Sequence, residues 1–210
     1  MRTIGLIGVG RIGSTLGRHF TRIGYEVALS NSRGPETLKD LQRELGEHAH
    51  ALTVAECAEY GDVGVVSIPL VAYRDVPRAG LEGKVVIDTC NYYPQRDGHF
   101  PELDDDSMTS SELIAAHLPT SHVVKAFNAI TSVHLAEWAR PTGDPARIAI
   151  PIAGANPDAK RIVADLIDQI GFDAVDTGDL GSSRSFQPGA VLYGADASAE
   201  KVRATLGLTG

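Results

Sequence analysis

A short glycine-rich pattern near the start of the chain combines residue types and a spacing that can do chemistry. It follows an apolar run over residues 3–9, opens a run of helical periodicity, and reads Gly8-Val9-Gly10-Arg11-Ile12-Gly13. In such a turn Gly8 permits the tight bend, Gly10 leaves room for a pyrophosphate, and Gly13 lets helix and strand approach closely. Free N–H groups of the first helical turn meet the anion. These six residues are therefore predicted to bind a dinucleotide, and a glycine-rich turn without a ligand is the structural alternative.

The end of the second predicted strand indicates which dinucleotide is bound. About 20 residues after the glycines, a site for NAD carries an Asp or Glu that binds the ribose hydroxyls. This sequence has no acidic residue there and carries Asn31, Ser32 and Arg33 instead. Hydroxyl and guanidinium groups hold a phosphate that a carboxylate would repel, so these three residues predict NADP. The alternative is that Ser32 only caps the helix that begins at Pro35 and that Arg33 is a solvated loop charge.

Three later strands, predicted over residues 63–68, 84–88 and 122–126, end in polar or proline-containing segments. Ligands of open α/β sheets bind at the carboxyl ends of the strands, so we expect these segments to border the ribose and the nicotinamide. The predicted contacts are Ser67, Ile68, Pro69, Leu70, Asn91 and Asn128. No catalytic residue is assigned, because hydride transfer needs little beyond two rings held face to face.

Other reactive residue types do not form a recognisable site. Cys90 has no helix N-terminus or charged partner evident in the sequence to lower the pKa of its thiol, so we do not assign it as a nucleophile. The seven histidines lie at no ligand spacing, and the acidic run over residues 104–106 lacks the alternating ligands of a calcium loop. No metal site is predicted.

Composition narrows the classes of partner. The chain has 210 residues, with 19 Lys plus Arg against 27 Asp plus Glu, a net charge of -8. This acidic balance disfavours nucleic acid and anionic membranes as partners. The longest apolar stretches fall short of the ~20 residues that span a bilayer, and Met1-Arg2 leads into a strand pattern rather than a secretory leader. With two distant cysteines, a reducing, cytoplasmic location is expected. The expected partner is a small-molecule redox acceptor.

Strand-like and helix-like runs alternate along the chain, which is typical of parallel crossovers. Strands are predicted over residues 3–9, 25–30, around 51, 63–68, 84–88, 122–126, 148–153 and 174–177. The expected fold is therefore α/β, a Rossmann-type doubly wound, mainly parallel sheet whose later strands extend the same sheet. Residues 92–109 are polar and are expected to form a surface loop, and the helix near residue 166 is expected to bury Ile162, Leu166 and Ile170.

Pro119 is the strongest candidate for a seam in the chain. Residues 1–119 would form an NADP-binding Rossmann half, and residues 120–210 a C-terminal α/β half packed on it. Because the segments on both sides are short and rich in strands, we expect one compact domain. The role of residues 181–210 is not predicted.

Four stretches carry a resemblance to a known family: the glycine pattern, the segment from Asn31 to Pro35, the strand end at Ser67-Ile68-Pro69 and the segment from Val124 to Asn128. Together they resemble the NADP oxidoreductases dependent on coenzyme F-420. The resemblance covers nearly the whole chain. It implies that residues 8–13 hold the pyrophosphate, that Ser32 and Arg33 take the 2′-phosphate, and that residues 68–70 line the nicotinamide side. The segment from Lys125 also looks like the cytosolic reductase domain of the STEAP metalloreductases, which passes electrons from NADPH through a flavin.

This resemblance implies hydride transfer between NADP(H) and a flat heterocyclic acceptor, with the deazaflavin coenzyme F-420 first and a flavin or quinone next. A non-catalytic NADP(H)-binding sensor and a hydroxy-acid or imine dehydrogenase are the alternatives. Deazaflavin-reducing archaeal members carry a histidine-containing segment where this chain has Phe127-Asn128-Ala129-Ile130, which leaves the acceptor open. Their apolar C-terminal helix makes dimer contacts, and Gln187-Pro188-Gly189 interrupts that region here, so a homodimer is one possibility only.

Overall fold

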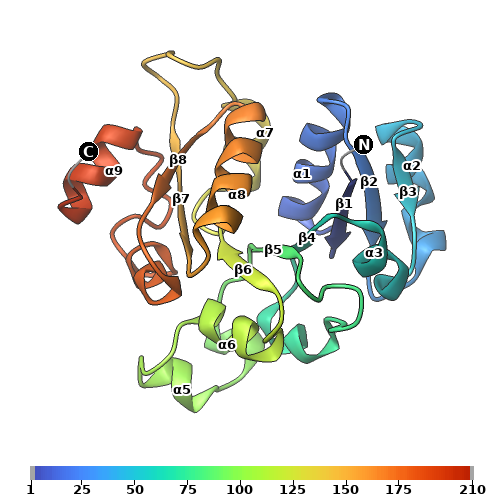
Figure 1. Ribbon diagram of the computed structural model, residues 1–210, viewed down its shortest axis with the longest axis horizontal. Coiled ribbons are helices and arrows are strands. Elements are labelled where there is room, and N and C mark those ends of the chain that lie inside the picture. Colours follow the sequence, from blue (N-terminus) through green and yellow to red (C-terminus); the bar gives the residue numbers. More distant parts are fainter. Residues whose placement is uncertain (1–2, 209–210) are drawn as a thin grey trace.

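An eight-stranded sheet runs through the molecule in the order β3-β2-β1-β4-β5-β6-β7-β8 (Figure 1). This computed structural model describes residues 3–208, so Met1 and Arg2, expected to lead into the first strand, lie outside the described residues. The strands are β1 (Thr3–Ile7), β2 (Glu26–Ser30), β3 (Ala49–Ala51), β4 (Val63–Val66), β5 (Val85–Asp88), β6 (His122–Lys125), β7 (Ala149–Gly154) and β8 (Asp173–Asp176). All neighbouring strands pair in parallel except β6 and β7. The predicted mainly parallel, Rossmann-type sheet is confirmed.

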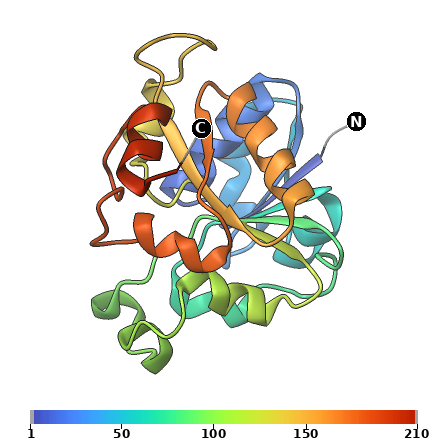
Figure 2. The same ribbon diagram turned by 60° about the vertical axis from the view of Figure 1, so that its left-hand side comes forward.

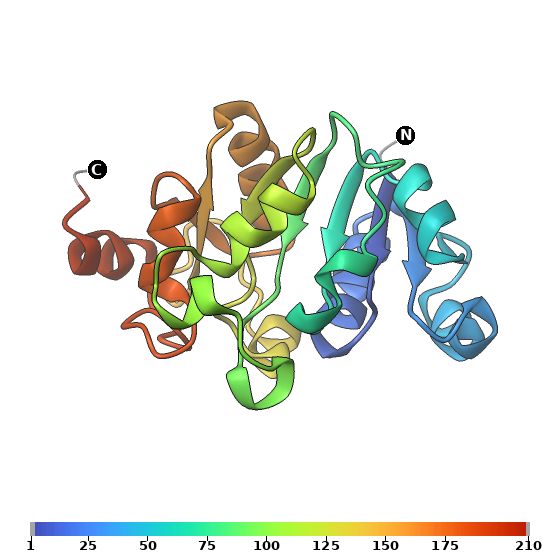
Figure 3. The same ribbon diagram turned by 90° about the horizontal axis from the view of Figure 1, so that it is seen from below.

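Helices cover both faces of the sheet, and α6 lies in front of it in Figure 3. One face carries α1 (Arg11–Arg22), α2 (Lys39–Leu45), α7 (Ser132–Glu137) and α8 (Pro157–Gln169). The other carries α3 (Val54–Tyr60), the 3₁₀ helix η2 (Leu70–Asp75) and α6 (Ser110–His117). The remaining elements are η1 (Pro35–Leu38), α4 (Pro94–Asp97), α5 (Pro101–Asp104), η3 (Leu180–Phe186) and α9 (Ala199–Leu206).

The first strand and helix pack closely because of their residue pattern. Leu16 and Phe20 lie four residues apart on α1 and are fully buried against the sheet. Burying such a side chain contributes about 1.5–3 kcal/mol relative to leaving it exposed. On the other face of β1, a Cβ at Gly5 would lie 2.2 Å from the carbonyl oxygen of Cys57, so this glycine permits the approach of α3. The β1–α1 junction is thus held rigidly from both sides.

Residues 92–109 are not the surface loop expected from the sequence. They contain α4 and α5, each of which begins at a proline. Proline suits the first position of a helix, where its missing N–H costs nothing, so Pro94 and Pro101 start turns rather than breaking structure. Asp97 and Leu103 are buried. This segment therefore packs on the side of the molecule that carries η2 and α6, and it helps to form the site described below.

The expected face of α8 was wrong at one position. Ile162 is 41% exposed, whereas Ala159, Val163, Leu166 and Ile167 are buried. The buried stripe runs at spacings of 4, 3 and 1 residues, so the small Ala159 and the branched Val163 sit against the strands. Ile170, just after the helix, is buried as predicted.

The sheet continues across the predicted seam at Pro119. Strand β6 begins three residues after that proline and pairs with β5 in the register Asp88 to Lys125. The division into two halves stays a prediction. Within residues 3–208, none of the helices combines the length and the apolar character that crossing a bilayer requires.

Candidate active site

The three glycines of the β1–α1 turn serve different purposes. Gly8 has φ +95°, and a Cβ on it would lie 2.3 Å from the carbonyl oxygen of Ser67. A Cβ on Gly13 would lie 2.1 Å from the carbonyl oxygen of Gly8. A Cβ on Gly10 would meet no atom within 4 Å. The fold itself requires Gly8 and Gly13, whereas Gly10 borders open space, as expected for a backbone that a ligand approaches closely.

The beginning of α1 is suited to an anion. Its N-cap residue is Gly10, no side chain caps the helix, and its first turn holds no acidic residue. The N–H groups of a first helical turn have no partner within the helix, and they carry the positive end of the helix dipole. A phosphate at this point would satisfy these groups without displacing any side chain of the chain.

A pocket of about 290 Å³, here named the Arg33 pocket, lies on one side of this turn. Arg33 is its cationic and Asp75 its anionic lining residue, and Val54 and Val76 contribute apolar surface. The predicted site residues that line it are Gly8, Val9, Gly10, Asn31, Ser32, Arg33, Ser67, Ile68 and Pro69. Arg33 therefore lies where the sequence predicts contact with a 2′-phosphate.

The loop that carries Arg33 is shaped by Asn31. The backbone N–H of Arg33 donates to the Asn31 side-chain oxygen at 2.8 Å, and the Asn31 amide donates to Thr37 Oγ1 at 2.9 Å. Gly34, not Ser32, is the N-cap residue of η1, and no side chain caps that helix. Ser32 therefore has no capping role, and among residues 3–208 no ion pair involves Arg33. Both side chains are exposed and able to meet a ligand.

A second pocket of about 550 Å³, here named the Tyr193 pocket, lies on the other side of the turn. Four residues line both pockets: Gly10, Ser67, Ile68 and Pro69. The two spaces therefore meet at the glycine turn. The Tyr193 pocket is also lined by the predicted site residues Arg11, Ile12, Asn91 and Asn128.

Two predicted site residues line neither pocket. Gly13 lies beneath the turn, in contact with Gly8. The side chain of Leu70 is fully buried between the sheet and the helices of the α3 face. Their roles in binding stay predictions, with Gly13 placed to support the turn and Leu70 to support the strand end.

Asn91 and Asn128 join the ends of β5 and β6 at the Tyr193 pocket. The Asn91 amide donates to the Asn128 carbonyl oxygen at 2.8 Å, and the Asn128 amide donates to Asn91 Oδ1 at 3.1 Å. The preceding residue, Phe127, has φ +62°, which is uncommon for a residue other than glycine. Such backbone strain is held in place only by surrounding structure and clusters at functional sites. These reciprocal bonds fix the two strand ends together.

A buried charge pair beneath the pocket was not predicted from the sequence. Lys125 and Asp88 are both 0% exposed, and Lys125 Nζ lies 3.0 Å from Asp88 Oδ2. The ammonium also donates to Ser110 Oγ at 3.1 Å and to the Cys90 carbonyl oxygen. Ser111 Oγ donates to Asp88 Oδ2 at 2.6 Å. A lysine among the apolar residues of a strand is the signal that would have indicated it, because a buried cation needs a partner.

Cys90 does have charged neighbours, contrary to the expectation from the sequence. Burial and the Asp88 carboxylate raise the pKa of its thiol well above the ordinary value, against the opposing effect of Lys125. The thiol therefore stays protonated. Its backbone N–H donates to Asp88 Oδ1 at 2.8 Å, so this residue contributes backbone to the pocket wall rather than a nucleophile.

The residues that line the Tyr193 pocket without having been predicted as site residues include Tyr93, Arg96 and Tyr193. Tyr93 and Arg96 come from the segment that was expected to be a surface loop. Tyr193 comes from the C-terminal segment, 100 residues further along the chain. No local pattern marks such residues, because a contact between distant segments leaves no spacing in the sequence.

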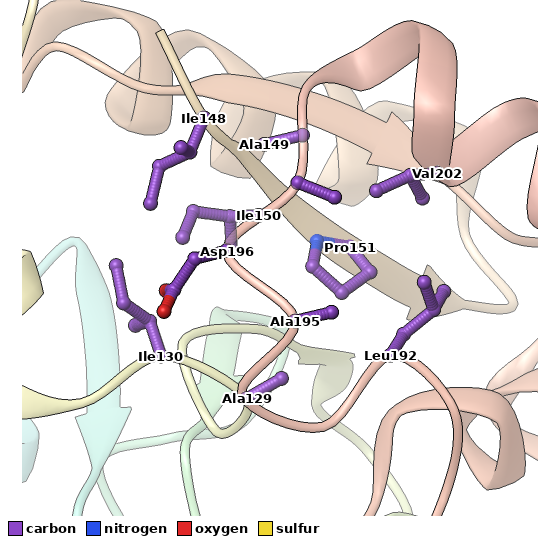
Figure 4. A pocket seen from close by; sticks show the side chains of 11 residues that line it. Ala129, Ile130, Ile148, Ala149, Ile150, Pro151, Leu192, Ala195, Asp196 and Val202 are labelled. Atoms are coloured by element: carbon purple, nitrogen blue, oxygen red, sulfur yellow. The ribbon is translucent and has the colours of Figure 1, made fainter. Parts of the chain in front are cut away.

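A much smaller cavity, of about 10 Å³, lies elsewhere, between β7 and the segment after Leu192 (Figure 4). Its lining is mostly apolar, with Ile130, Ile150 and Leu192 among it, and Asp196 is the charged exception. A space of this size holds about one water molecule. It is a packing defect in the C-terminal core and no candidate for a cofactor.

Comparison with known proteins gives a partial match to one family. Residues 3–92, less than half of the chain, match the model of the family described as NADP oxidoreductase coenzyme F420-dependent. That stretch holds the glycine turn, the Arg33 loop, the β4 end and Asn91. Residues after 92 lie outside the matched stretch.

Solved structures show the same fold over nearly the whole chain. A hypothetical protein from Sinorhizobium meliloti is 30% identical, with a TM-score of 0.81, over 94% of this chain and 96% of that one. A protein from Arthrobacter sp. FB24, provisionally described as an F420-dependent NADP reductase, is 23% identical, with a TM-score of 0.75, over 88% of each chain. The second likeness shows the fold alone.

A curated human relative is larger. Metalloreductase STEAP2 of Homo sapiens is 29% identical over 192 residues, which are 88% of this chain and 35% of that protein. The chain thus spans about a third of the length of the curated relatives it matches.

Proposed function

We propose that this protein is an enzyme that transfers hydride between NADP(H) and a flat heterocyclic acceptor, with the deazaflavin coenzyme F-420 as the first candidate and a flavin as the second. One observation carries the proposal. The Arg33 pocket and the Tyr193 pocket meet at Gly10. Arg33 lines the first, and the strand ends line the second, which has a volume of about 550 Å³. A dinucleotide that crosses the glycine turn would place its nicotinamide in the Tyr193 pocket, next to the acceptor.

The residues present fit NADP. Gly10 offers open space and the α1 N-terminus offers free N–H groups for the pyrophosphate. Arg33 and Ser32 are exposed in the Arg33 pocket and would hold the 2′-phosphate. Ile68, Pro69 and the joined asparagines would border the nicotinamide. When bound, the nicotinamide supplies or takes up the hydride.

The chain's own contribution is orientation. The Asn91–Asn128 bonds and the Lys125–Asp88 pair hold two strand ends in fixed positions. Rigid walls of this kind keep two rings in the near-attack geometry that hydride transfer requires, at about 3–3.5 Å between reacting atoms. No side chain has to accept or donate a proton for the hydride itself to move.

The choice of acceptor rests on the comparisons. The family description names coenzyme F420, and the Arthrobacter neighbour carries the same coenzyme in its description. The STEAP relative is described as a metalloreductase. The segment from Lys125 resembles the STEAP reductase domain, which passes electrons through a flavin, and this resemblance supports a flavin as the second candidate.

The test is the loss of NADPH absorbance when purified protein is mixed with oxidised F-420 or, in parallel, FMN. Turnover with F-420 at least tenfold faster than with FMN supports the first candidate, and the reverse order supports the second. NADPH binding without oxidation by either compound contradicts the proposal and favours the non-catalytic sensor.

A further inference from the structure

The hydroxyl groups of Tyr93 and Tyr193 contact each other at the wall of the Tyr193 pocket. Their rings come from two segments 100 residues apart. Both side chains are only half-buried. The pair therefore faces the space in which the proposed function places the acceptor, on segments other than the glycine turn.

The C-terminal segment is tied to the pocket at three points. The Asn128 amide donates to the Phe186 carbonyl oxygen at 2.8 Å, and the Gly194 N–H donates to the Ala129 carbonyl oxygen at 2.8 Å. The Asn91 amide donates to the Tyr193 hydroxyl oxygen at 3.4 Å. Figure 2 shows this segment, in orange and red, beside the green segment that contains α6, and η3 packs against α6. Tyr193 is thus held in a defined position.

Tyr93 is held from its own side by Arg96 and Asp97. The Arg96 guanidinium lies 4.9 Å from the centre of the Tyr93 ring. The buried Asp97 carboxylate binds that guanidinium at 2.8 Å and accepts the Tyr93 N–H at 2.9 Å. Because Asp97 neutralises Arg96, this arginine positions the ring and adds no net charge to the wall.

Counting hydrogens shows what the pair can do. Two hydroxyl groups carry two hydrogens, and one of them lies between the two oxygens. The Asn91 amide supplies a hydrogen to Tyr193 and takes none. Within residues 3–208 the second hydroxyl hydrogen has no acceptor among the hydrogen bonds of the two tyrosines, so it can be donated to a ligand in the pocket. Burial and the contact with Tyr93 raise the pKa of Tyr193, so the Tyr193 hydroxyl keeps its hydrogen at neutral pH.

We propose that the Tyr93–Tyr193 hydroxyl pair recognises the acceptor by donating a hydrogen bond to a carbonyl oxygen or an imine nitrogen at the edge of its heterocyclic ring. This proposal rests on the proposed function and deepens it. It selects flat acceptors with a hydrogen-bond-accepting edge over purely hydrocarbon rings, and it gives the C-terminal segment a role in acceptor specificity.

The test measures binding apart from turnover. Binding of FMN is followed by the quenching of its fluorescence at saturating NADP⁺, which keeps FMN out of the dinucleotide site. Tyr93→Phe and Tyr193→Phe remove one hydroxyl each and keep the ring. Tyr92→Phe is the matched control, because the Tyr92 hydroxyl bonds Gly98 and Asp104 and does not line this pocket.

We expect each of the two pocket variants to bind FMN roughly 2- to 12-fold more weakly than the wild type, the range for losing one hydrogen bond. The double variant removes both hydroxyl hydrogens, so it should bind FMN at least as weakly as the weaker of the two single variants. Tyr92→Phe should bind FMN as the wild type does, and the affinity for NADPH should be unchanged in all four proteins.

Three results would overturn the proposal: equal FMN affinity in the wild type and both pocket variants, no FMN binding by the wild type, or an equal loss of FMN affinity in Tyr92→Phe. A lower melting temperature with unchanged FMN affinity would mean that the pair is structural only. The proposed function fails separately, if NADPH is bound but not oxidised.

Discussion

Lys125 and Asp88 lie directly opposite each other on the parallel strands β6 and β5, with Nζ 3.0 Å from Oδ2 and neither side chain exposed. The pair joins the last strand before the predicted seam to the first strand after it. It also holds the backbone of Cys90 from both sides, through its carbonyl oxygen and its N–H. The pocket wall and the integrity of the sheet thus depend on the same two side chains.

Replacing Lys125 with Met should destabilise the protein strongly. The substitution keeps the apolar stem and leaves the Asp88 carboxylate buried without its cation, which costs about 3–5 kcal/mol. Urea unfolding of the wild type and the variant measures this difference. Lys84→Met is a useful comparison, since the half-buried Lys84 lies just before β5 and its Nζ donates to the Ala58 and Glu59 carbonyl oxygens of α3. A loss below about 1 kcal/mol in Lys125→Met would show that the pair contributes little.

Replacing Arg33 with Ala should weaken NADPH far more than NADH. A charge-assisted hydrogen bond to the 2′-phosphate contributes roughly 1.5–3 kcal/mol, and NADH has no such phosphate. Titration of each nucleotide by fluorescence measures both affinities. Arg43→Ala serves as the control, because Arg43 is exposed on the nearby α2, pairs with Asp40, and lines neither pocket. Equal losses for NADPH and NADH would remove Arg33 from the phosphate site.

Replacing Gly10 with Val should abolish nucleotide binding without unfolding the protein. Its Cβ would meet no protein atom within 4 Å and would point into the space shared by the two pockets. Gly13→Ala is the contrasting variant, because its Cβ would lie 2.1 Å from the Gly8 carbonyl oxygen and must shift the backbone. We expect a near-normal melting temperature in Gly10→Val and a lowered one in Gly13→Ala. Retained NADPH affinity in Gly10→Val would refute the glycine-turn site.

Stability should fall on the acid side because of His19. This buried histidine bonds the Leu135 carbonyl oxygen at 2.6 Å and accepts from Arg22 at 2.6 Å. Burial, with Arg22 adding to it, lowers its pKa from 6.5, against the effect of Leu135. As pH falls through 6.5, the unfolded chain therefore binds this proton more readily than the folded one, and the free energy of unfolding decreases.

The His19→Gln variant checks this account. Its free energy of unfolding should fall less than that of the wild type between pH 7.5 and pH 5, as followed by urea unfolding at several pH values. His48 is expected to change the free energy of unfolding in the opposite direction, because its bond to Glu26 raises its pKa. That bond stabilises the folded state at pH values below the raised pKa. Parallel profiles for the wild type and His19→Gln would contradict the assignment.

The parts of the site that could be predicted from the sequence are local. The glycine turn, the Arg33 loop and the strand ends at Pro69 and Asn91 each depend on a few consecutive residues, whose spacing carries the geometry. The mainly parallel pairing of the strands followed from their alternation with helices. A homodimer and a cytoplasmic location stay predictions.

The missed parts depend on contacts between distant segments. Lys125 and Asp88 become partners only when β5 and β6 pair, although a lysine inside an apolar strand was a usable signal. Tyr193 reaches the pocket through the fold of the C-terminal segment, for which no short pattern exists. The segment after Tyr92 was expected to be a surface loop because it is polar, whereas Pro94 and Pro101 begin helical turns.

The most direct test of the proposed hydride transfer uses NADPH that carries deuterium at C4, on one face or the other, with oxidised F-420 as the acceptor. The account predicts that one of the two labelled forms transfers its deuterium to the ring carbon of the reduced deazaflavin, detected by mass spectrometry, without exchange with water. Reduced deazaflavin that carries hydrogen from water with both labelled forms, or no reduction at all, would contradict it.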